Sequence, residues 1–409
     1  MSLGRRAWRA LPRGLRRGVL FGGMALVAPR PARPVPEPSG PVILAGYLSA
    51  PTGLGEGARR MLAAMREQGL AVLPADLSWA HRQAPRHPPP VLPEGPGTIV
   101  IHVNGPMLPW GLFALGRRVV AGKRIIAYWA WELPALPRDW LRGLRFAHEI
   151  WAPSTFCLRA MSRPGAPPLR LMPHPVPVPV PVLAPPSAAK TRETFGLPAD
   201  AFVSLCFFDA GSSLARKNPM GAIEAHRRAF GDRPDRILLL KTHGTATAGE
   251  SWHRLAALAA SRPNVRILDA DLPDAERWAL MAVADLVVSL HRAEGFGFAI
   301  AEAMALGRPV VATAWSGNLD FMAGPGVHPV PAGLVPARDP QATYEFPGMS
   351  WADPDLDAAA LAMRRIADAP ALRRPPPVAF PAPDYAAALG LGTAGGAAAE
   401  RLVTPHETT

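Results

Sequence analysis

The chain is poor in cysteine: Cys157 and Cys206 are its only two among 409 residues. They stand far apart, with no CxxC pair, so their spacing supports neither a disulfide framework nor a zinc site. The histidines do not supply the missing ligands, because none of them stands at ligand-like spacing from another. Isolated cysteines are typical of a reducing compartment. We therefore expect a cytoplasmic protein without a metal ion or other cofactor.

Acidic residues are missing before Glu37, and this stretch carries eight arginines and no lysine. These arginines supply eight of the twelve formal positive charges, which leaves +4 for the rest of the chain. The body is therefore only mildly basic. It also lacks the interleaved aromatic and basic residues typical of RNA-binding modules, so nucleic acid is not an expected partner.

No apolar run approaches the length of a membrane span. The arginine-rich start is followed by the short apolar run Val19–Val27, as in a secretory signal peptide, but residues 29–34 make a poor cleavage site. We interpret the leader as an interfacial segment attracted to anionic lipid at the inner face of the membrane. The alternative is a disordered leader without a function.

Prolines are frequent, and a dense group at residues 173–181 cannot form a helix. On either side of it, apolar strand-like runs alternate with amphipathic helix-like segments, which predicts two α/β domains with parallel sheets, of the Rossmann-like kind. The predicted organisation is a basic leader at 1–39, an N-terminal domain at 40–172, a proline-rich linker at 173–188, a C-terminal domain at 189–370 and a Pro/Ala-rich tail at 371–409.

Ten strands are expected from these runs. In the N-terminal domain they are 42–48, 71–77, 98–103, 124–129 and 149–152, and in the C-terminal domain 202–208, 237–241, 266–268, 286–290 and 310–313. Parallel strands end at the same edge of a sheet, and ligands of such folds bind there. Residues with charged, polar or aromatic side chains just after each strand are therefore the candidates for a binding site.

The most informative such stretch runs from Glu294 to Glu302, after the strand at 286–290. Gly295 and Gly297 allow a close backbone approach, and a helix beginning near Phe296–Phe298 presents the positive end of its dipole to an anion. The two carboxylates suit nearby hydroxyl groups, so the pattern favours a nucleotide sugar. The alternative is a capping acid and a solvated helix residue.

A second loop follows the strand at 202–208. It contains Asp209, the adjacent cations Arg216 and Lys217, and a proline at 219 that opens a helix. Two cations at a strand end and a helix start suit a diphosphate. Without a ligand their position near the positive end of a helix dipole is unfavourable. We therefore assign them to phosphate binding.

Two segments of the N-terminal domain are candidates for acceptor contact. Gly53 and Gly55 lie in a glycine-containing turn after the first strand, although a flexible turn without ligand is equally compatible with them. Trp131 and Glu132 follow the fourth strand, where an aromatic wall can stack on a sugar; Trp129, in contrast, is expected in the core.

Two other enzyme types are disfavoured. The pair Asp269 and Asp271 has the spacing of metal-chelating carboxylates in some sugar transferases, but it precedes a helix start, where acids serve as caps. A nicotinamide-dependent dehydrogenase needs GxGxxG after the first strand, and the turn at 52–57 lacks that spacing.

Taken together, these segments resemble the retaining GT-B glycosyltransferases of the GT4 type over roughly residues 40–375. The motifs that carry the resemblance, in order, are Phe208-Asp209, Arg216-Lys217-Asn218-Pro219, Ser289–Gly297, Glu302-Ala303-Met304, Ser316–Phe321 and Trp351–Asp355. The resemblance implies two Rossmann-like domains that face each other across a cleft. It also implies transfer of a hexose from a nucleotide-diphosphate sugar, as in polysaccharide biosynthesis, to a carbohydrate or lipid-linked acceptor.

The resemblance also implies roles for individual residues. Glu302 would bind the ribose hydroxyls and Glu294 a hydroxyl of the donor sugar. Arg216 and Lys217 would neutralise the diphosphate, helped by backbone N–H groups around Phe296–Phe298, so that no divalent metal is needed. Many relatives carry a histidine where this chain has Trp131 and Glu132. A binding module that has lost catalysis is therefore the alternative function.

Overall fold

The computed structural model describes residues 13–80, 91–178 and 185–391. Its contacts divide the chain into two compact units. The first unit comprises the residues up to Trp131, Ala135–Pro175 and the residues from Ala382 on; the second comprises Glu132–Pro134 and Val176–Pro381.

The first unit is built on a parallel sheet of six strands in the order β2-β1-β3-β4-β5-β6. Strands β1, β3 and β5 are buried along their whole length, which is why their sequences do not alternate between apolar and polar residues. The strands are β1 (Val42–Gly46), β2 (Val72–Asp76), β3 (Gly97–His102), β4 (Lys123–Tyr128), β5 (Glu149–Ala152) and β6 (Leu169–Leu171). The helices are α2 (Arg13–Val27), α3 (Gly53–Glu67), α4 (Leu108–Leu115), α5 (Arg117–Val120), α6 (Thr155–Met161) and α14 (Tyr385–Leu389), with 3₁₀ turns η1 (Gly105–Met107) and η2 (Trp140–Phe146).

The second unit repeats this plan with the strand order β12-β11-β10-β7-β8-β9, again parallel throughout. The strands are β7 (Phe202–Asp209), β8 (Arg236–His243), β9 (Val265–Asp269), β10 (Leu286–Ser289), β11 (Val310–Thr313) and β12 (Val327–Val330). The helices are α7 (Pro185–Thr194), α8 (Leu214–Lys217), α9 (Pro219–Phe230), α10 (Glu250–Ala260), α11 (Asp274–Val283), α12 (Phe298–Ala305) and α13 (Leu356–Asp368). The 3₁₀ turns are η3 (Ala210–Ser212), η4 (Thr245–Thr247), η5 (Gly317–Asp320) and η6 (Pro370–Arg373).

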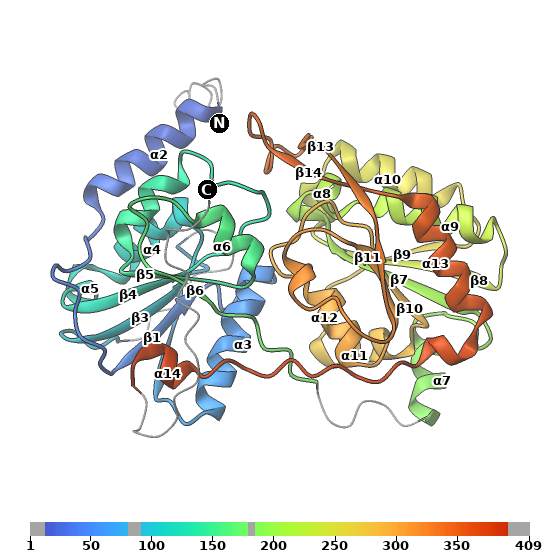
Figure 1. The fold of residues 1–409 in the computed structure, drawn as a ribbon, viewed down its shortest axis with the longest axis horizontal. Helices are drawn as coiled ribbons and strands as arrows, with labels where there is room; N and C mark the ends of the chain where they lie inside the picture. Colours follow the sequence, from blue (N-terminus) through green and yellow to red (C-terminus); the bar gives the residue numbers. More distant parts are fainter. Residues whose placement is uncertain (1–12, 81–90, 179–184, 392–409) are drawn as a thin grey trace. The chain divides into compact units, whose positions relative to one another are not determined.

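Helices cover both faces of the second sheet (Figure 1). One apolar cluster joins the sheet to α11 and α12, and a second joins it to α9, α10 and α13. The two six-stranded parallel sheets confirm the predicted α/β class and the ten predicted strands. Strands β6 and β12 and an antiparallel hairpin, β13 (Ala332–Pro336) with β14 (Ser350–Pro354), were not predicted.

Part of the predicted Pro/Ala-rich tail, residues 371–409, is built into the two units. Residues up to Pro381 belong to the second unit, whereas α14 belongs to the first. There the fully buried Tyr385 stacks near Trp151, with ring centroids 6.4 Å apart, and its backbone N–H donates to Gln68 Oε1 at 3.0 Å. An aromatic anchor therefore fixes part of the predicted tail to the first sheet's unit.

Helix α2 packs on the first unit near α4 and η2, where Arg142 Nη1 donates to the carbonyl of Gly18 at 3.3 Å. The helix nevertheless exposes five large apolar side chains: Leu15, Val19, Leu20, Leu26 and Val27. The leader's first twelve residues lie outside the described residues. Within the described part of the chain, we find no helix with both the length and the apolarity to cross a bilayer.

Candidate functional site

The predicted phosphate-binding residues meet at the carboxyl ends of β7 and β10, which are neighbours in the second sheet. After β7 the chain makes η3 and the short helix α8, which carries Arg216 and Lys217. After β10 it makes an irregular turn that carries Glu294 and then enters α12. Adjacent parallel strands thus bring together two loops that are about 80 residues apart in sequence, as ligand sites of such sheets require.

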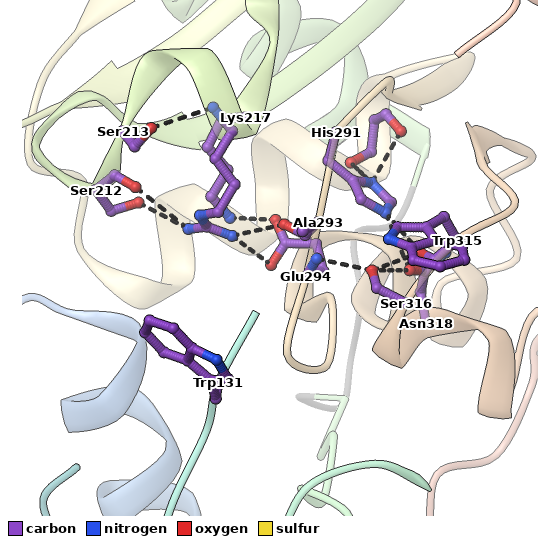
Figure 2. Close-up of polar contacts among 12 residues, drawn as sticks. Trp131, Ser212, Ser213, Lys217, His291, Ala293, Glu294, Trp315, Ser316 and Asn318 are labelled. Atoms are coloured by element: carbon purple, nitrogen blue, oxygen red, sulfur yellow. Dashed lines mark hydrogen bonds and ion pairs between the residues drawn. The ribbon is translucent and has the colours of Figure 1, made fainter. Parts of the chain in front are cut away.

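Glu294 forms ion pairs with both cations of this site. The Lys217 ammonium donates to one carboxylate oxygen, and Arg216 Nη1 lies 3.3 Å from the other (Figure 2). The guanidinium also donates to the carbonyl of Ala293 at 2.8 Å and to Ser212 Oγ at 3.0 Å. The structure therefore brings together Arg216 and Lys217, predicted to bind the diphosphate, and Glu294, predicted to contact the donor sugar.

These contacts decide the charge state of the site. Burial by itself would raise the pKa of Glu294, but Lys217 and Arg216 hold it down to about 2. Burial disfavours the charged form of Arg216, yet Tyr344 and Glu294 keep its pKa raised. Two cations therefore face the ionised Glu294 carboxylate, and Glu132, whose pKa is raised by burial, lies near the same cations. Adjacent cations of this kind are suited to an anionic ligand.

A polar network fixes the Glu294 backbone from the other side. The Glu294 N–H donates to Ser316 Oγ at 2.8 Å, and its carbonyl accepts from the Gly317 N–H at 2.9 Å. Asn318 Oδ1 accepts from His291 Nε2 at 3.0 Å (Figure 2). Asn318 Nδ2 donates to the Thr313 carbonyl at 2.9 Å. Ser316 adopts φ of +77°, an unfavourable backbone conformation for a residue with a side chain. The site is thus held in place by its surroundings.

Helix α12 begins at Phe298, with Gly297 at φ of +101° as its N-cap. Glycine is favoured there because only a residue without Cβ adopts this conformation at little cost. Phe296 is buried against Phe298 and Phe321, with ring centroids 5.4 Å and 5.1 Å away. The predicted strand, glycine turn and helix are therefore present at these positions.

Glu302, one turn into α12, is 3% exposed. It accepts a hydrogen bond of 2.7 Å from Arg277 Nη1 of α11, whose guanidinium also lies 3.3 Å from Asp274. The sequence analysis did not identify Arg277, because its contact to Glu302 depends on how α11 packs beside α12. Glu302 thus has its own cationic partner, separate from the Glu294 cluster.

The other acids of this edge act within the fold. Asp209 caps η3 through the Gly211 N–H at 2.8 Å, and Asp269 accepts from Thr245 Oγ1 at 2.7 Å. Across the described ranges, no three His, Cys, Asp or Glu side chains gather in a group that could hold a metal ion. Asp269 ends β9 and does not cap the following helix, because the N-cap of α11 is Pro273, without a side-chain cap.

One of the two glycine candidates of the first unit, Gly55, has a packing explanation, whereas a Cβ on Gly53 would meet no atom within 4 Å. Helix α3 already begins at Gly53, with Thr52 as its N-cap, so the predicted turn is in fact the first turn of a helix. A Cβ on Gly55 would lie 2.5 Å from the carbonyl oxygens of Tyr47 and Ala50. Glycine is required there whether or not a ligand binds.

Trp131 and Glu132 have different surroundings. Trp131 is 5% exposed, donates from Nε1 to the Ala135 carbonyl at 2.8 Å and packs on Trp140 in the first unit. Glu132 belongs to the second unit. Its pKa is raised, because the effect of burial outweighs the opposing effect of Arg216. It is half-buried and hydrogen-bonded to Tyr344. The two neighbours therefore have separate structural roles.

A cavity of about 520 Å³ lies near α8, α10 and the β13–β14 hairpin. Leu214 and Ala215 line it, but Arg216, Lys217 and Glu294 do not. The candidate site is therefore the charged cluster of Arg216, Lys217 and Glu294, and not this cavity.

Residues 229–345 match the sequence model of the family described as glycosyl transferases group 1, a segment that includes Glu294 and Glu302. A search of curated protein sequences found no match.

Several solved structures share the architecture. HepE from Anabaena, solved in complex with UDP and glucose, is 17% identical, with 81% of this chain and 91% of that chain covered and a TM-score of 0.53. WaaG, a glycosyltransferase involved in lipopolysaccharide biosynthesis, is 15% identical (81% and 92% covered, TM-score 0.53), and a glycosyltransferase from Rickettsia africae ESF-5 is 12% identical (80% and 88% covered, TM-score 0.54). The chain therefore has the GT-B fold, and its second unit carries the sequence signature of glycosyl transferases group 1.

Proposed function

We propose that this protein transfers a sugar from a nucleotide-diphosphate sugar to a carbohydrate or lipid-linked acceptor, with the donor held by the second unit. The observation that carries the proposal is the pair of cations, the buried Arg216 and the partly exposed Lys217, which share the Glu294 carboxylate at the carboxyl ends of β7 and β10. HepE, a neighbour in fold, binds UDP and glucose, which supports a nucleotide sugar as the donor class.

The cations are assigned to the donor's diphosphate. Arg216 Nε has no hydrogen-bond partner within the described residues, so the guanidinium keeps one N–H for a ligand oxygen. The positive end of the α12 dipole adds to this charge, and Gly295, Phe296, Gly297 and Phe298 form the backbone that approaches the phosphates. Asp209, at the end of β7, completes the proposed donor site.

Donor binding would exchange the Lys217–Glu294 ion pair for a contact between Lys217 and phosphate. The released Glu294 carboxylate would then accept a hydrogen bond from a hydroxyl of the donor sugar. Glu302 would accept hydrogen bonds from the ribose hydroxyls, oriented by Arg277. Glu294 would thus contact the transferred sugar, and Glu302 the ribose of the nucleotide.

The transfer itself is proposed to retain the anomeric configuration without a metal ion. The bond between the anomeric carbon and the diphosphate oxygen breaks, and its electron pair passes to the diphosphate, where Arg216 and Lys217 stabilise the new charge. The acceptor hydroxyl attacks from the same face, and its proton passes to the departing phosphate oxygen. Gly53, Gly55, Trp131 and Glu132 remain the proposed acceptor-side residues.

Replacing Glu302 by alanine is expected to weaken nucleotide binding about tenfold, because a charge-assisted hydrogen bond to the ribose is lost. Isothermal titration calorimetry with UDP, GDP and ADP measures this. Glu276→Ala is the matched control, since Glu276 is an exposed carboxylate on the neighbouring α11. Equal affinities of the Glu302 variant and the wild type would remove Glu302 from the site.

The same titrations test the proposed function. At least one of the three nucleoside diphosphates should bind to the wild-type protein and raise its thermal stability, as any ligand of the native state does. Binding of none of them would refute a nucleotide-sugar donor. A non-catalytic binding module is the second candidate, and Glu132 in place of the relatives' histidine is the observation that favours it.

We further propose a cytoplasmic protein whose helix α2 contacts the membrane surface. Leu15, Val19 and Leu26 recur at i, i+4 and i+11 and so share one exposed face of the helix. The arginines of the leader complement anionic headgroups. An apolar face combined with nearby positive charge is the pattern of an interfacial helix.

This proposal predicts co-sedimentation with vesicles that contain phosphatidylglycerol, and little with pure phosphatidylcholine. The double variant Leu15→Glu/Leu26→Glu should bind these vesicles at least about tenfold more weakly, because two apolar side chains no longer insert. Leu334→Glu, at an exposed leucine of the second unit, serves as the control. Undiminished binding of the double variant would refute the role of α2.

A further inference from the structure

The loop between β13 and β14, residues 337–349, is closed around one buried carboxylate. Asp339 is 1% exposed and accepts hydrogen bonds from the backbone N–H groups of Gln341, Thr343 and Tyr344 at 3.1, 2.8 and 3.0 Å. An ionised group buried at this depth is stable only when its oxygens are satisfied, and here the loop's own backbone satisfies them. The loop therefore has a defined conformation that is set by its own sequence.

The same loop is attached to the segment that carries the site's cations. Ser213 Oγ donates to Asp339 at 2.9 Å. The Leu214 N–H donates to Gln341 Oε1 at 2.5 Å, and Gln341 Nε2 donates to the Ala210 carbonyl at 2.9 Å. Ser213 adopts φ of +81°, a conformation that a residue with a side chain keeps only when its surroundings impose it. The loop supplies part of those surroundings.

Tyr344 is the residue that this attachment brings to the site. Its buried ring lies beneath the Arg216 guanidinium, whose central carbon is 5.0 Å from the ring centroid. The edge of the guanidinium is meanwhile occupied by Ala293, Ser212 and Glu294. A planar cation held at its edge and covered on one face has little freedom to rotate.

We propose that Tyr344 is a positioning residue for the donor: by stacking on Arg216 it fixes the plane of the guanidinium that receives the diphosphate. This inference rests on the proposed function. The alternative is that Tyr344 only fills space in the core of the second unit. In that case its aromatic character would be irrelevant to nucleotide binding.

Two substitutions of Tyr344 separate these roles. Tyr344→Phe keeps the aromatic face and loses the hydroxyl, whereas Tyr344→Leu keeps an apolar side chain and loses the face. UDP, GDP and ADP are titrated into each variant by calorimetry, and thermal unfolding is recorded alongside. We expect Tyr344→Phe to bind within about twofold of wild type and Tyr344→Leu about tenfold more weakly, as loss of a desolvated cation–π contact predicts.

Gln341→Ala provides a second route that leaves the core untouched, in case Tyr344→Leu does not fold. It removes the loop's contacts to Leu214 and Ala210, and we expect about threefold weaker nucleotide binding, as loss of one or two hydrogen bonds predicts. Glu345→Ala, an exposed position of the same loop, is the control and should bind like the wild type.

Lys217→Ala distinguishes failure of this inference from failure of the proposed function. If Lys217→Ala weakens nucleotide binding while Tyr344→Leu and Gln341→Ala do not, only the positioning role is overturned. If Tyr344→Phe is as weak as Tyr344→Leu, the hydroxyl rather than the stacked ring is responsible, which also overturns it. If no nucleotide binds to the wild type, the proposed function falls, and the inference falls with it.

Discussion

Replacing Lys217 by alanine is expected to lower kcat for sugar transfer by at least about a hundredfold, the effect seen when one preorganised group that stabilises transition-state charge is removed. Lys217 is partly exposed at the end of α8, and its ammonium contacts Glu294. It contributes a full charge where the leaving diphosphate would gain negative charge. Steady-state kinetics with saturating donor measures the loss.

The effect should be specific to this position. Lys190→Ala, at an exposed lysine of α7, is the matched control and should leave kcat unchanged. The Lys217→Ala protein should also keep its melting temperature, because Glu294 retains Arg216 as a partner. A kcat within a few-fold of wild type, in a folded Lys217→Ala protein, would contradict the assignment.

Replacing Glu294 by glutamine should reduce both activity and stability. Activity falls because the proposed hydrogen bond to the donor sugar weakens and the balance of charge around Lys217 changes. Stability falls because the buried Arg216 loses its carboxylate partner, and breaking a buried pair in this way costs about 3 kcal/mol. Urea unfolding at pH 7 measures the free energy of unfolding.

The stability effect should depend on pH in a defined direction. The pKa of Glu294 is lowered to about 2 from an ordinary value of 4.5, so its ionised form favours the folded state. This contribution is fully present above about pH 4.5 and is lost as the pH falls towards 2. The difference in unfolding free energy between wild type and Glu294→Gln should therefore shrink between pH 5 and pH 3. A constant difference would contradict the role of the ionised carboxylate.

The cluster of Glu294, Arg216 and Lys217 could be predicted from the sequence because its signals are local. Buried parallel strands are continuous apolar runs, and each candidate loop follows one of them directly. Glu294, Arg216 and Lys217 could be grouped because strand ends share one edge of a sheet. The start of α12 at Phe298 was readable from the glycines before it.

The contacts between elements could not be predicted in this way. Arg277 meets Glu302 only because α11 packs beside α12, and Tyr344 meets Arg216 only because an unpredicted hairpin folds onto α8. Neither residue has a motif of its own. The packing requirement for glycine at position 55 could not be predicted either, because the sequence does not show the carbonyl oxygens that approach it.

The proposed transfer is tested most directly by the release of nucleoside diphosphate from a panel of UDP-, GDP- and ADP-sugars, with carbohydrate and lipid-linked acceptors present and the Lys217→Ala protein measured in parallel. The proposed mechanism predicts that the wild type releases nucleoside diphosphate from at least one donor, with a glycosylated product of retained anomeric configuration, and that Lys217→Ala abolishes most of this release. Tight binding of a donor without any release would contradict catalysis and identify a binding module instead.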